Sequence, residues 1–184
     1  MKLIFKLSNF QIFICIIILL SACKEDKKKQ LSQKELEKKI SSSMTDIHRG
    51  VLKNQVDSIK KFVNSNYSNM LESNTGLWYE IYKNKDGLLI QQGDDITLSY
   101  TVGLLDGKII YSSDSLGLLS FRAGSGGVEK GLEEAVLLLN EGDKARLILP
   151  PHLAHGLTGD MKKIPRLSIL LYDIEVIKVI KNRK

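Results

Sequence analysis

The sequence contains little cysteine, proline or tryptophan: 2 Cys, 3 Pro and 1 Trp among 184 residues. This composition excludes a small disulfide-stapled protein and a proline-rich or collagen-like chain. Long apolar runs are also missing except near the N-terminus, where ten of the twelve residues from Phe10 to Ser21 are aliphatic, aromatic or cysteine. That run is shorter than the roughly 20 apolar residues that a membrane-spanning helix needs. The remaining length allows one domain, or two if one of them is small.

The N-terminus has the parts of a bacterial export signal. Lys2 and Lys6 supply positive charge, residues 12–20 form the apolar run, and Leu20-Ser21-Ala22-Cys23 closes it. The closing residues resemble the lipobox of bacterial lipoproteins, in which the cysteine thiol receives a diacylglyceryl group and the chain is cleaved before it. The resemblance implies a signal peptide over residues 1–22 and lipidation of Cys23. A plain signal peptide with an accidental cysteine, or a short membrane anchor, is the alternative.

Processing at this position would leave a mature chain without a free thiol. Cleavage removes Cys15 and the two lysines of the signal, and lipidation uses Cys23, so 162 residues with a net charge of +4 remain. A disulfide, a metal–thiolate site and a cysteine nucleophile are then excluded. Because acyl chains anchor a protein stably to a membrane, the basic charge does not indicate nucleic acid, and we expect no nucleic-acid partner.

The residues directly after Cys23 give information on the cellular location of the protein. Lys24-Glu25-Asp26 resembles the lysine–acid–acid export signal of Bacteroidetes surface lipoproteins, although the start of a solvated tether has the same composition. We expect a lipid-anchored protein of the bacterial cell envelope, at the outer membrane. The sequence leaves the choice between the periplasmic and the surface leaflet open.

A polar tether and a helical arm follow. Residues 23–34 are rich in lysine, which is typical of a solvated linker. Over residues 35–72 apolar side chains recur every three or four positions, which predicts an amphipathic helix. Ser41-Ser42-Ser43 interrupts the pattern, and Ser43 with Asp46 resembles an N-cap, so we expect two helices or one with a weak joint. The helical arm could pack on the domain, form a stalk or dimerise.

Residues 76–180 have the pattern of a small α+β domain. Segments of β-forming residues alternate with turn signals, among which Asp106-Gly107 predicts a two-residue hairpin. Residues 129–140 place apolar side chains on one helical face and predict the single helix. The segment from Pro150 to Pro165 is a long loop, and such loops are usually functional. The expected strands are residues 77–82, 96–105, 108–111, a short strand from residue 121, 144–149 and 167–180.

Two other groupings resemble sites by spacing alone. His152 and His155 are three residues apart, as metal ligands can be, but no third ligand is near them in the sequence. Gly124-Ser125-Gly126-Gly127 is rich in glycine, but it lacks the Lys-Ser/Thr of a phosphate-binding loop. We expect loop histidines with ordinary partners, a sharp turn before the helix, and no metal or cofactor.

A series of short motifs runs in order through residues 76–180. They are Gly76-Leu-Trp-Tyr-Glu-Ile, Gly93-Asp94, Ser99-Tyr100-Thr101, Asp106-Gly107-Lys108, Ser112-Ser113, Val128-x-x-Gly131-x-Glu133-Glu134-Ala135, Glu141-Gly142-x-Lys144-Ala145, Leu149-Pro150-Pro151-x-x-Ala154-His155-Gly156, Ile164-Pro165 and Leu171-Tyr172-Asp173-Ile174-Glu175. Together they resemble the FKBP-type peptidyl-prolyl cis-trans isomerases. With its helical arm and lipobox, the chain also resembles the gliding-motility lipoprotein isomerases of Bacteroidetes.

The resemblance implies an FKBP-like half-barrel. In this fold a curved antiparallel sheet wraps on one short helix, and a peptide pocket lies between the helix and the sheet. The reaction is rotation about an X–Pro amide, whose barrier is about 18–20 kcal/mol. No bond breaks, so the resemblance implies no nucleophile, metal or cofactor. The implied partners are proline-containing segments of envelope or exported proteins.

The resemblance also assigns residues to the pocket. Tyr100, Val128 and Ile164 match the family's wall tyrosine, backbone-contact valine and loop isoleucine, and Tyr172 stands where a phenylalanine is usual. We therefore expect catalytic roles for Tyr100, Tyr111, His155 and Tyr172, and substrate binding by Ile110, Leu119, Val128, Glu129, Leu132 and Ile164.

Several of these residues depart from the family pattern. Tyr111 replaces an aspartate that the family ties to the twisted amide, and His155 replaces a tyrosine. Isomerase activity, reduced by these changes, is the expected function, and a catalytically weak proline-binding chaperone or scaffold module of a gliding or secretion machine is the alternative. The other departures are Ile110 for an aromatic residue, Leu119 for a phenylalanine, Glu129 for an isoleucine and Leu132 for the floor tryptophan.

Overall fold

The structure is a computed structural model that describes residues 32–182, without the side chains of residues 47 and 48. The predicted signal peptide over residues 1–22, the lipidation site Cys23 and nearly all of the predicted tether lie outside the described residues. Among residues 32–182, no helix combines the length and the apolar character that crossing a membrane requires.

The first described element is one long helix, α2 (Gln33–Asn66), without a break at the three serines. Ser32 and Glu35 form a capping box, in which the Glu35 amide donates to Ser32 Oγ and the Ser32 amide donates to Glu35 Oε2. The predicted N-cap at Ser43 is wrong, because Ser43 lies inside α2. The hydroxyl of the neighbouring Ser42 donates to the backbone carbonyl of Lys39 at 3.0 Å. The serine side chain therefore has a partner on the helix itself, and the helix continues through the serines.

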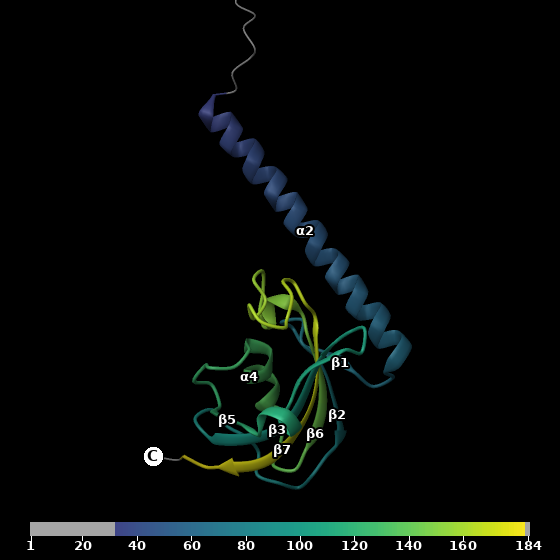
Figure 1. Cartoon of the computed structure of the whole chain (residues 1–184), viewed down its shortest axis with the longest axis vertical. Coiled ribbons are helices and arrows are strands. Elements are labelled where there is room, and N and C mark those ends of the chain that lie inside the picture. Colours follow the sequence, from purple (N-terminus) through teal and green to yellow (C-terminus); the bar gives the residue numbers. More distant parts are fainter. Residues whose placement is uncertain (1–31, 183–184) are drawn as a thin grey trace, which may run out of the picture. The chain divides into compact units, whose positions relative to one another are not determined.

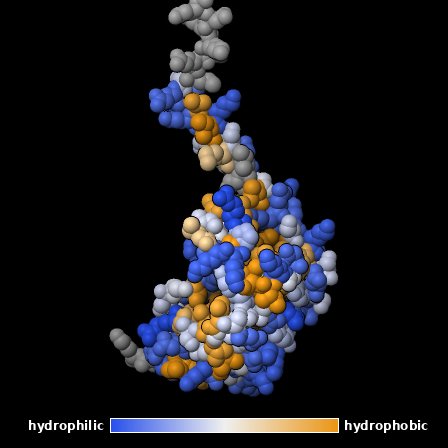
Figure 2. Space-filling view, viewed as in Figure 1, coloured by the Kyte–Doolittle hydropathy of each residue, from blue (hydrophilic) through white to orange (hydrophobic). Residues whose placement is uncertain are grey.

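The chain's contacts divide it into two units, residues 1–47 and residues 48–184. In the first unit Leu36, Ile40 and Met44 are exposed and lie four residues apart on α2, and the space-filling view shows hydrophobic side chains along this helix (Figure 2). In the second unit the end of α2 buries Ile59 and Val63 in a small cluster with sheet residues. The helix ends at Asn66 rather than near residue 72.

The second unit contains a curved antiparallel sheet with α4 packed against one face (Figure 1). Neighbouring strands follow the order β1-β2-β6-β7-β3-β4, and β5 pairs with β3. This confirms the predicted α+β half-barrel. The strands are β1 (Leu71–Glu72), β2 (Trp78–Lys83), β3 (Asp95–Leu104), β4 (Ile109–Ser112), β5 (Leu119–Arg122), β6 (Lys144–Leu149) and β7 (Leu170–Ile180), and the short helices are α3 (Ser113–Leu116), α4 (Lys130–Val136) and the 3₁₀ turn η1 (Pro151–Leu153).

Several element boundaries differ from the prediction for local reasons. The strand predicted from residue 167 begins at Leu170, because Leu167 has a φ of 58°, which is incompatible with extended backbone. The helix predicted over residues 129–140 ends at Val136, and the following Leu139 carbonyl accepts a hydrogen bond from the Ile90 amide. Strand β1 has two residues and α3 is a single helical turn. Neither is long enough to show a periodic pattern of apolar residues in the sequence.

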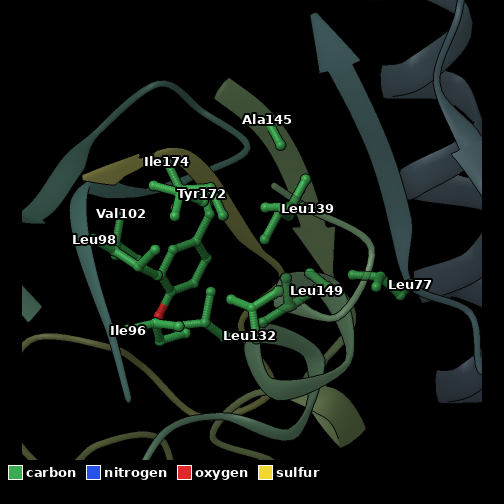
Figure 3. Packing of buried hydrophobic residues seen from close by; sticks show 14 of the residues in the cluster. Leu77, Ile96, Leu98, Val102, Leu132, Leu139, Ala145, Leu149, Tyr172 and Ile174 are labelled. Atoms are coloured by element: carbon green, nitrogen blue, oxygen red, sulfur yellow. The ribbon is translucent and has the colours of Figure 1, made fainter. Parts of the chain in front are cut away.

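The main core lies between α4 and the sheet. Every second residue of β7 from Leu170 to Val176 is buried, which is the period of a strand with one covered face. Figure 3 shows Tyr172 and Ile174 of β7 in the same core as Leu132 of α4 and residues of the neighbouring strands. The buried members from other elements include Leu77, Ile96, Leu98, Val102, Leu132, Leu139, Ala145 and Leu149.

Gly131 sets the distance between α4 and β6. A Cβ atom on this residue would lie 2.6 Å from Cγ of Leu149, which is too close for carbon atoms. We expect Gly131→Ala to lower the free energy of unfolding by about 1–3 kcal/mol through overpacking, measured by urea denaturation. Gly50→Ala is the matched control, because its Cβ on α2 would meet no atom within 4 Å. The control should be neutral or stabilising, and an equal loss in both variants would contradict this account.

Candidate functional site

A pocket of about 1000 Å³ opens on the concave side of the sheet, and strands, the start of α4 and the loop after η1 supply its walls. Residues from four strands (β3, β4, β5 and β7), from the short helices and from that loop meet there although they are far apart in sequence. Its lining combines apolar, aromatic and charged groups. The lining residues are Tyr100, Val102, Tyr111, Leu116, Leu119, Gly127, Val128, Glu129, Lys130, His152, Ala154, His155, Gly156, Thr158, Gly159, Asp160, Lys162 and Tyr172.

Strand register places the tyrosines in the pocket. Val102 of β3 pairs with Tyr111 of β4 on one side and with Tyr172 of β7 on the other, so these three residues form a row across the sheet. Tyr100 lies two residues before Val102 and therefore on the same face. Three aromatic rings and a buried valine thus line one wall of a recess.

One polar group in the recess is the carboxylate of Glu129, at the residue before α4. Its Oε1 atom accepts a hydrogen bond from the Tyr172 hydroxyl at 2.8 Å and lies 2.9 Å from Nε2 of His155. Burial raises the pKa of Tyr172 far above its ordinary value, and the charge of Glu129 raises it further. Tyr172 therefore keeps its proton and remains a hydrogen-bond donor to Glu129.

A second carboxylate, Asp160, is supplied by the long loop. The Tyr111 hydroxyl donates to Oδ2 of Asp160, and the amides of Lys162 and Ile164 donate to Oδ1 at 2.9 and 2.8 Å. The ammonium of Lys163 lies 5.4 Å from the centre of the Tyr111 ring. The loop is therefore folded around its own aspartate and tied to β4 through Tyr111.

The Asp160 network predicts a pH effect on stability. Burial raises the pKa of Asp160, but hydrogen bonds from Tyr111 and from the Lys162 and Ile164 amides, together with the charge of His155, lower it to about 2 from an ordinary 3.8. A lowered pKa in the folded state means that this carboxylate stabilises the fold above the unfolded value and loses that effect as pH falls through the folded value. We expect Asp160→Asn to be less stable than the wild-type protein near neutral pH, with the gap narrowing below about pH 4 in urea titrations. A constant gap would contradict the assignment.

The predicted site residues fall into two groups. Seven of them line the pocket, namely Tyr100, Tyr111, Leu119, Val128, Glu129, His155 and Tyr172. The other three, Ile110, Leu132 and Ile164, are buried in the core and are not among the lining residues, so they support the pocket from behind. The roles assigned to all ten stay predictions.

The sequence alone did not point to Asp160 or Val102. A signal for Asp160 was available, because it lies in the long loop between prolines that was expected to be functional. Val102 carries no signal beyond its alternation in β3, since a buried valine is ordinary core composition.

The two groupings set aside on sequence grounds have other partners. His152 lies 2.9 Å from the Thr75 carbonyl through Nε2, whereas His155 contacts Glu129, so the two rings serve different contacts. The amides of Gly124 and Gly126 both donate to the carboxylate of Glu133, at 2.5 and 2.9 Å. That turn is therefore tied to α4 by a side chain of the protein itself.

Fold and pocket define a half-barrel binding domain with an aromatic recess between a curved sheet and the short helix α4. The sequence matches the family model described as FKBP-type peptidyl-prolyl cis-trans isomerase over residues 88–177. It is 39% identical over 90 residues to FK506-binding protein 2 of Dictyostelium discoideum, covering 48% of this chain and 68% of that protein. It is also 39% identical over 88 residues to FK506-binding protein 1A of Emericella nidulans, covering 47% of this chain and 82% of that protein. The chain belongs to the FKBP-type peptidyl-prolyl cis-trans isomerases.

Solved structures support the same conclusion. The crystal structure of FkpA from Escherichia coli matches with a TM-score of 0.60 and 26% identity, covering 97% of this chain and 84% of that one. The crystal structure of AtFKBP13 matches with a TM-score of 0.58 and 33% identity, covering 60% of this chain and 98% of that one. The predicted FKBP-like fold and isomerase class are thus confirmed.

Proposed function

We propose that this isomerase is held by a lipid anchor in the bacterial cell envelope and assists the folding of envelope or exported proteins by rotating their X–Pro bonds. The observation that carries the site assignment is the row of Tyr111, Val102 and Tyr172 across three strands, which lines a recess large enough for a prolyl segment. The location rests on the export signal and lipobox in the sequence.

The recess can lower the rotation barrier without any covalent step. A planar amide is stabilised by resonance and by water around its separated charges, and twisting removes the resonance. Tyr100 and Tyr172 present ring surface, and Val102 and Leu119 present aliphatic surface, so the bound amide loses water. The planar form then loses more solvation than the twisted form, which lowers the difference between them.

An exchange assay tests this function directly. The full chain, purified in detergent, is added to a short peptide with an X–Pro bond, whose uncatalysed exchange takes tens to hundreds of seconds. We expect faster exchange, and we expect Tyr100→Ala to lower kcat/KM by removing one wall. Exchange at the rate of the detergent buffer alone would refute isomerisation by this pocket.

A second candidate is a binding module with little turnover. Four apolar side chains in the two segments that flank the pocket, α3 with its following residues and the long loop, are strongly exposed: Leu116, Leu118, Leu157 and Met161. Such a rim suits an unfolded client. Suppression of client aggregation that persists in Tyr100→Ala would favour this candidate, and suppression lost together with isomerisation would count against it.

The anchor is tested separately. Cys23→Ser should move the protein from the membrane fraction to the soluble fraction and abolish labelling by a radioactive fatty acid. Membrane retention of the variant would refute the lipid anchor but leave the isomerase function untouched. A place in a gliding or secretion machine would show as loss of that process in cells that lack the protein.

The exposed stripe of α2 suits pairing with a second copy of the chain. Leu36, Ile40 and Met44 recur every four residues and are each 46–66% exposed, and apolar stripes of this spacing pack between helices. Sedimentation of the full chain in detergent should show a dimer that Ile40→Asp dissociates and Lys39→Asp does not. A monomer in the wild-type protein would refute pairing.

A further inference from the structure

Glu129 is a carboxylate inside a pocket whose lining also holds aromatic, aliphatic and other charged side chains. Its side chain is only 16% exposed, and it stands at the turn that leads into α4. Two side chains from opposite sides of the recess converge on one of its oxygens: the Tyr172 hydroxyl from β7 and Nε2 of His155 from the loop. These contacts hold the carboxylate in one orientation.

The second oxygen of this carboxylate is accessible. In residues 32–182 no hydrogen bond to Oε2 of Glu129 is found, whereas every fully buried side-chain nitrogen or oxygen atom there has a partner. Oε2 is therefore not fully buried, and Glu129 is one of the residues that line the pocket. A fixed carboxylate with one free oxygen is an acceptor prepared for a donor on the bound peptide.

The other charged side chains around the pocket are less suited than Glu129 to accept a hydrogen bond from a bound peptide. Asp160 already accepts three hydrogen bonds, one from Tyr111 and two from backbone amides. Lys130 and Lys162 also line the pocket, but they are exposed, where water and salt weaken their effect. The side chain of His155 is 30% exposed and that of Glu129 is 16% exposed, so Glu129 is less hydrated than the histidine it contacts.

We propose that Glu129 makes this isomerase select prolines that have lysine or arginine as a direct neighbour, a preference that rests on the proposed function of the pocket. The aliphatic stem of such a residue packs on Leu119 and Val128, and its cationic head reaches Oε2. Because the carboxylate is already fixed and partly dehydrated, only the side chain of the peptide has to be ordered, which lowers the cost that weakens exposed ion pairs.

The test changes the peptide first and leaves the protein intact. Two short peptides are compared with the full wild-type chain in detergent: one has lysine beside the proline, and the other has norleucine, which keeps the stem and lacks the ammonium. Two such pairs are made: in one pair the lysine or norleucine directly precedes the proline, and in the other it directly follows the proline. We expect kcat/KM about tenfold higher for lysine in at least one position, in keeping with a hydrogen bond to a charged group. The ratio should fall as salt is added.

A variant then assigns the preference to one residue. Glu129→Gln keeps an oxygen that accepts from Tyr172 and His155 but loses the charge, so the ratio of lysine to norleucine peptides should fall to near one. Glu72→Gln, on β1 and outside the pocket lining, is the matched control, and its ratio should equal that of the wild-type protein. A ratio that Glu129→Gln leaves unchanged would overturn the role of Glu129.

The outcomes separate this inference from the function on which it rests. Turnover of both peptides at equal kcat/KM would overturn the preference and leave the isomerase function standing. No acceleration of either peptide would refute the function itself. A preference for norleucine would show that the pocket acts as an apolar site in spite of its carboxylate, and would also overturn the proposal.

Discussion

Replacing Asp94 by alanine is expected to lower the free energy of unfolding by about 1–3 kcal/mol, because the Gln91 amide and the partly buried Lys181 ammonium lose their acceptor. Asp94 is 4% exposed and accepts hydrogen bonds from the Lys181 ammonium and the Gln91 amide, both at 2.7 Å. The same ammonium also donates to the Leu89 carbonyl, so this contact ties the segment after β7 to the loop before β3. Total stability is only about 5–15 kcal/mol, so the loss is a large fraction of it.

The adjacent Asp95 provides the matched control. It pairs with Arg122 at 2.9 Å, but its side chain is 41% exposed, so Asp95→Ala should destabilise the fold far less than Asp94→Ala. Chemical denaturation of both variants measures the difference. The double variant Asp94→Ala/Lys181→Met should lose less stability than the sum of the losses in the two single variants, because either substitution alone already breaks the pair. Equal losses at positions 94 and 95 would contradict the argument from burial.

The second large effect is expected at Tyr172, which serves the core and the pocket together. Its ring is 3% exposed, and its hydroxyl donates to Glu129. Tyr172→Ala removes a buried ring, so we expect a loss of about 3–5 kcal/mol in the free energy of unfolding and no measurable isomerisation. Thermal denaturation and the exchange assay measure the two effects.

Tyr172→Phe separates the ring from the hydroxyl. It retains the buried ring and the wall of the recess but takes one donor away from Glu129. The loss of stability should therefore be only about 1–3 kcal/mol, the value for a hydrogen bond to a charged group. If Tyr172→Phe were as unstable as Tyr172→Ala, the hydroxyl rather than the ring would hold this region together.

Much of the fold could be predicted from the sequence because its signals are local. Alternation in residues 170–176, a turn at Asp106-Gly107 and the apolar face of α4 each depend on residues close together in the chain. The predicted two-residue hairpin is wrong in length, because β3 ends at Leu104 and β4 begins at Ile109. One error arose where two local signals compete for the start of the same helix. Ser43 resembles an N-cap, yet it lies inside α2, whose start is capped earlier by Ser32 and Glu35.

The pocket was predictable only in part for a related reason. The resemblance pointed to Tyr111 as a position that lacks the family's carboxylate, and that substitution is plain in the sequence. What no local pattern shows is that Tyr111 donates to Asp160, a residue 49 positions away in the long loop. The convergence of Tyr172 and His155 on Glu129 also joins three separate segments. Contacts between such distant segments are determined by the register of the sheet and the path of the loop.

The place of β7 in the sheet has a consequence for the order of folding. It is the last described strand along the chain, but it lies between β6 and β3 in the middle of the sheet. While the chain emerges from the ribosome, β6 and β3 have no strand to join them, so the sheet remains in two separate halves. Pairing across such large sequence separations is slow and leaves strand edges exposed meanwhile. The nascent chain therefore gains Tyr172, and with it a complete recess, only at the final step of its own folding.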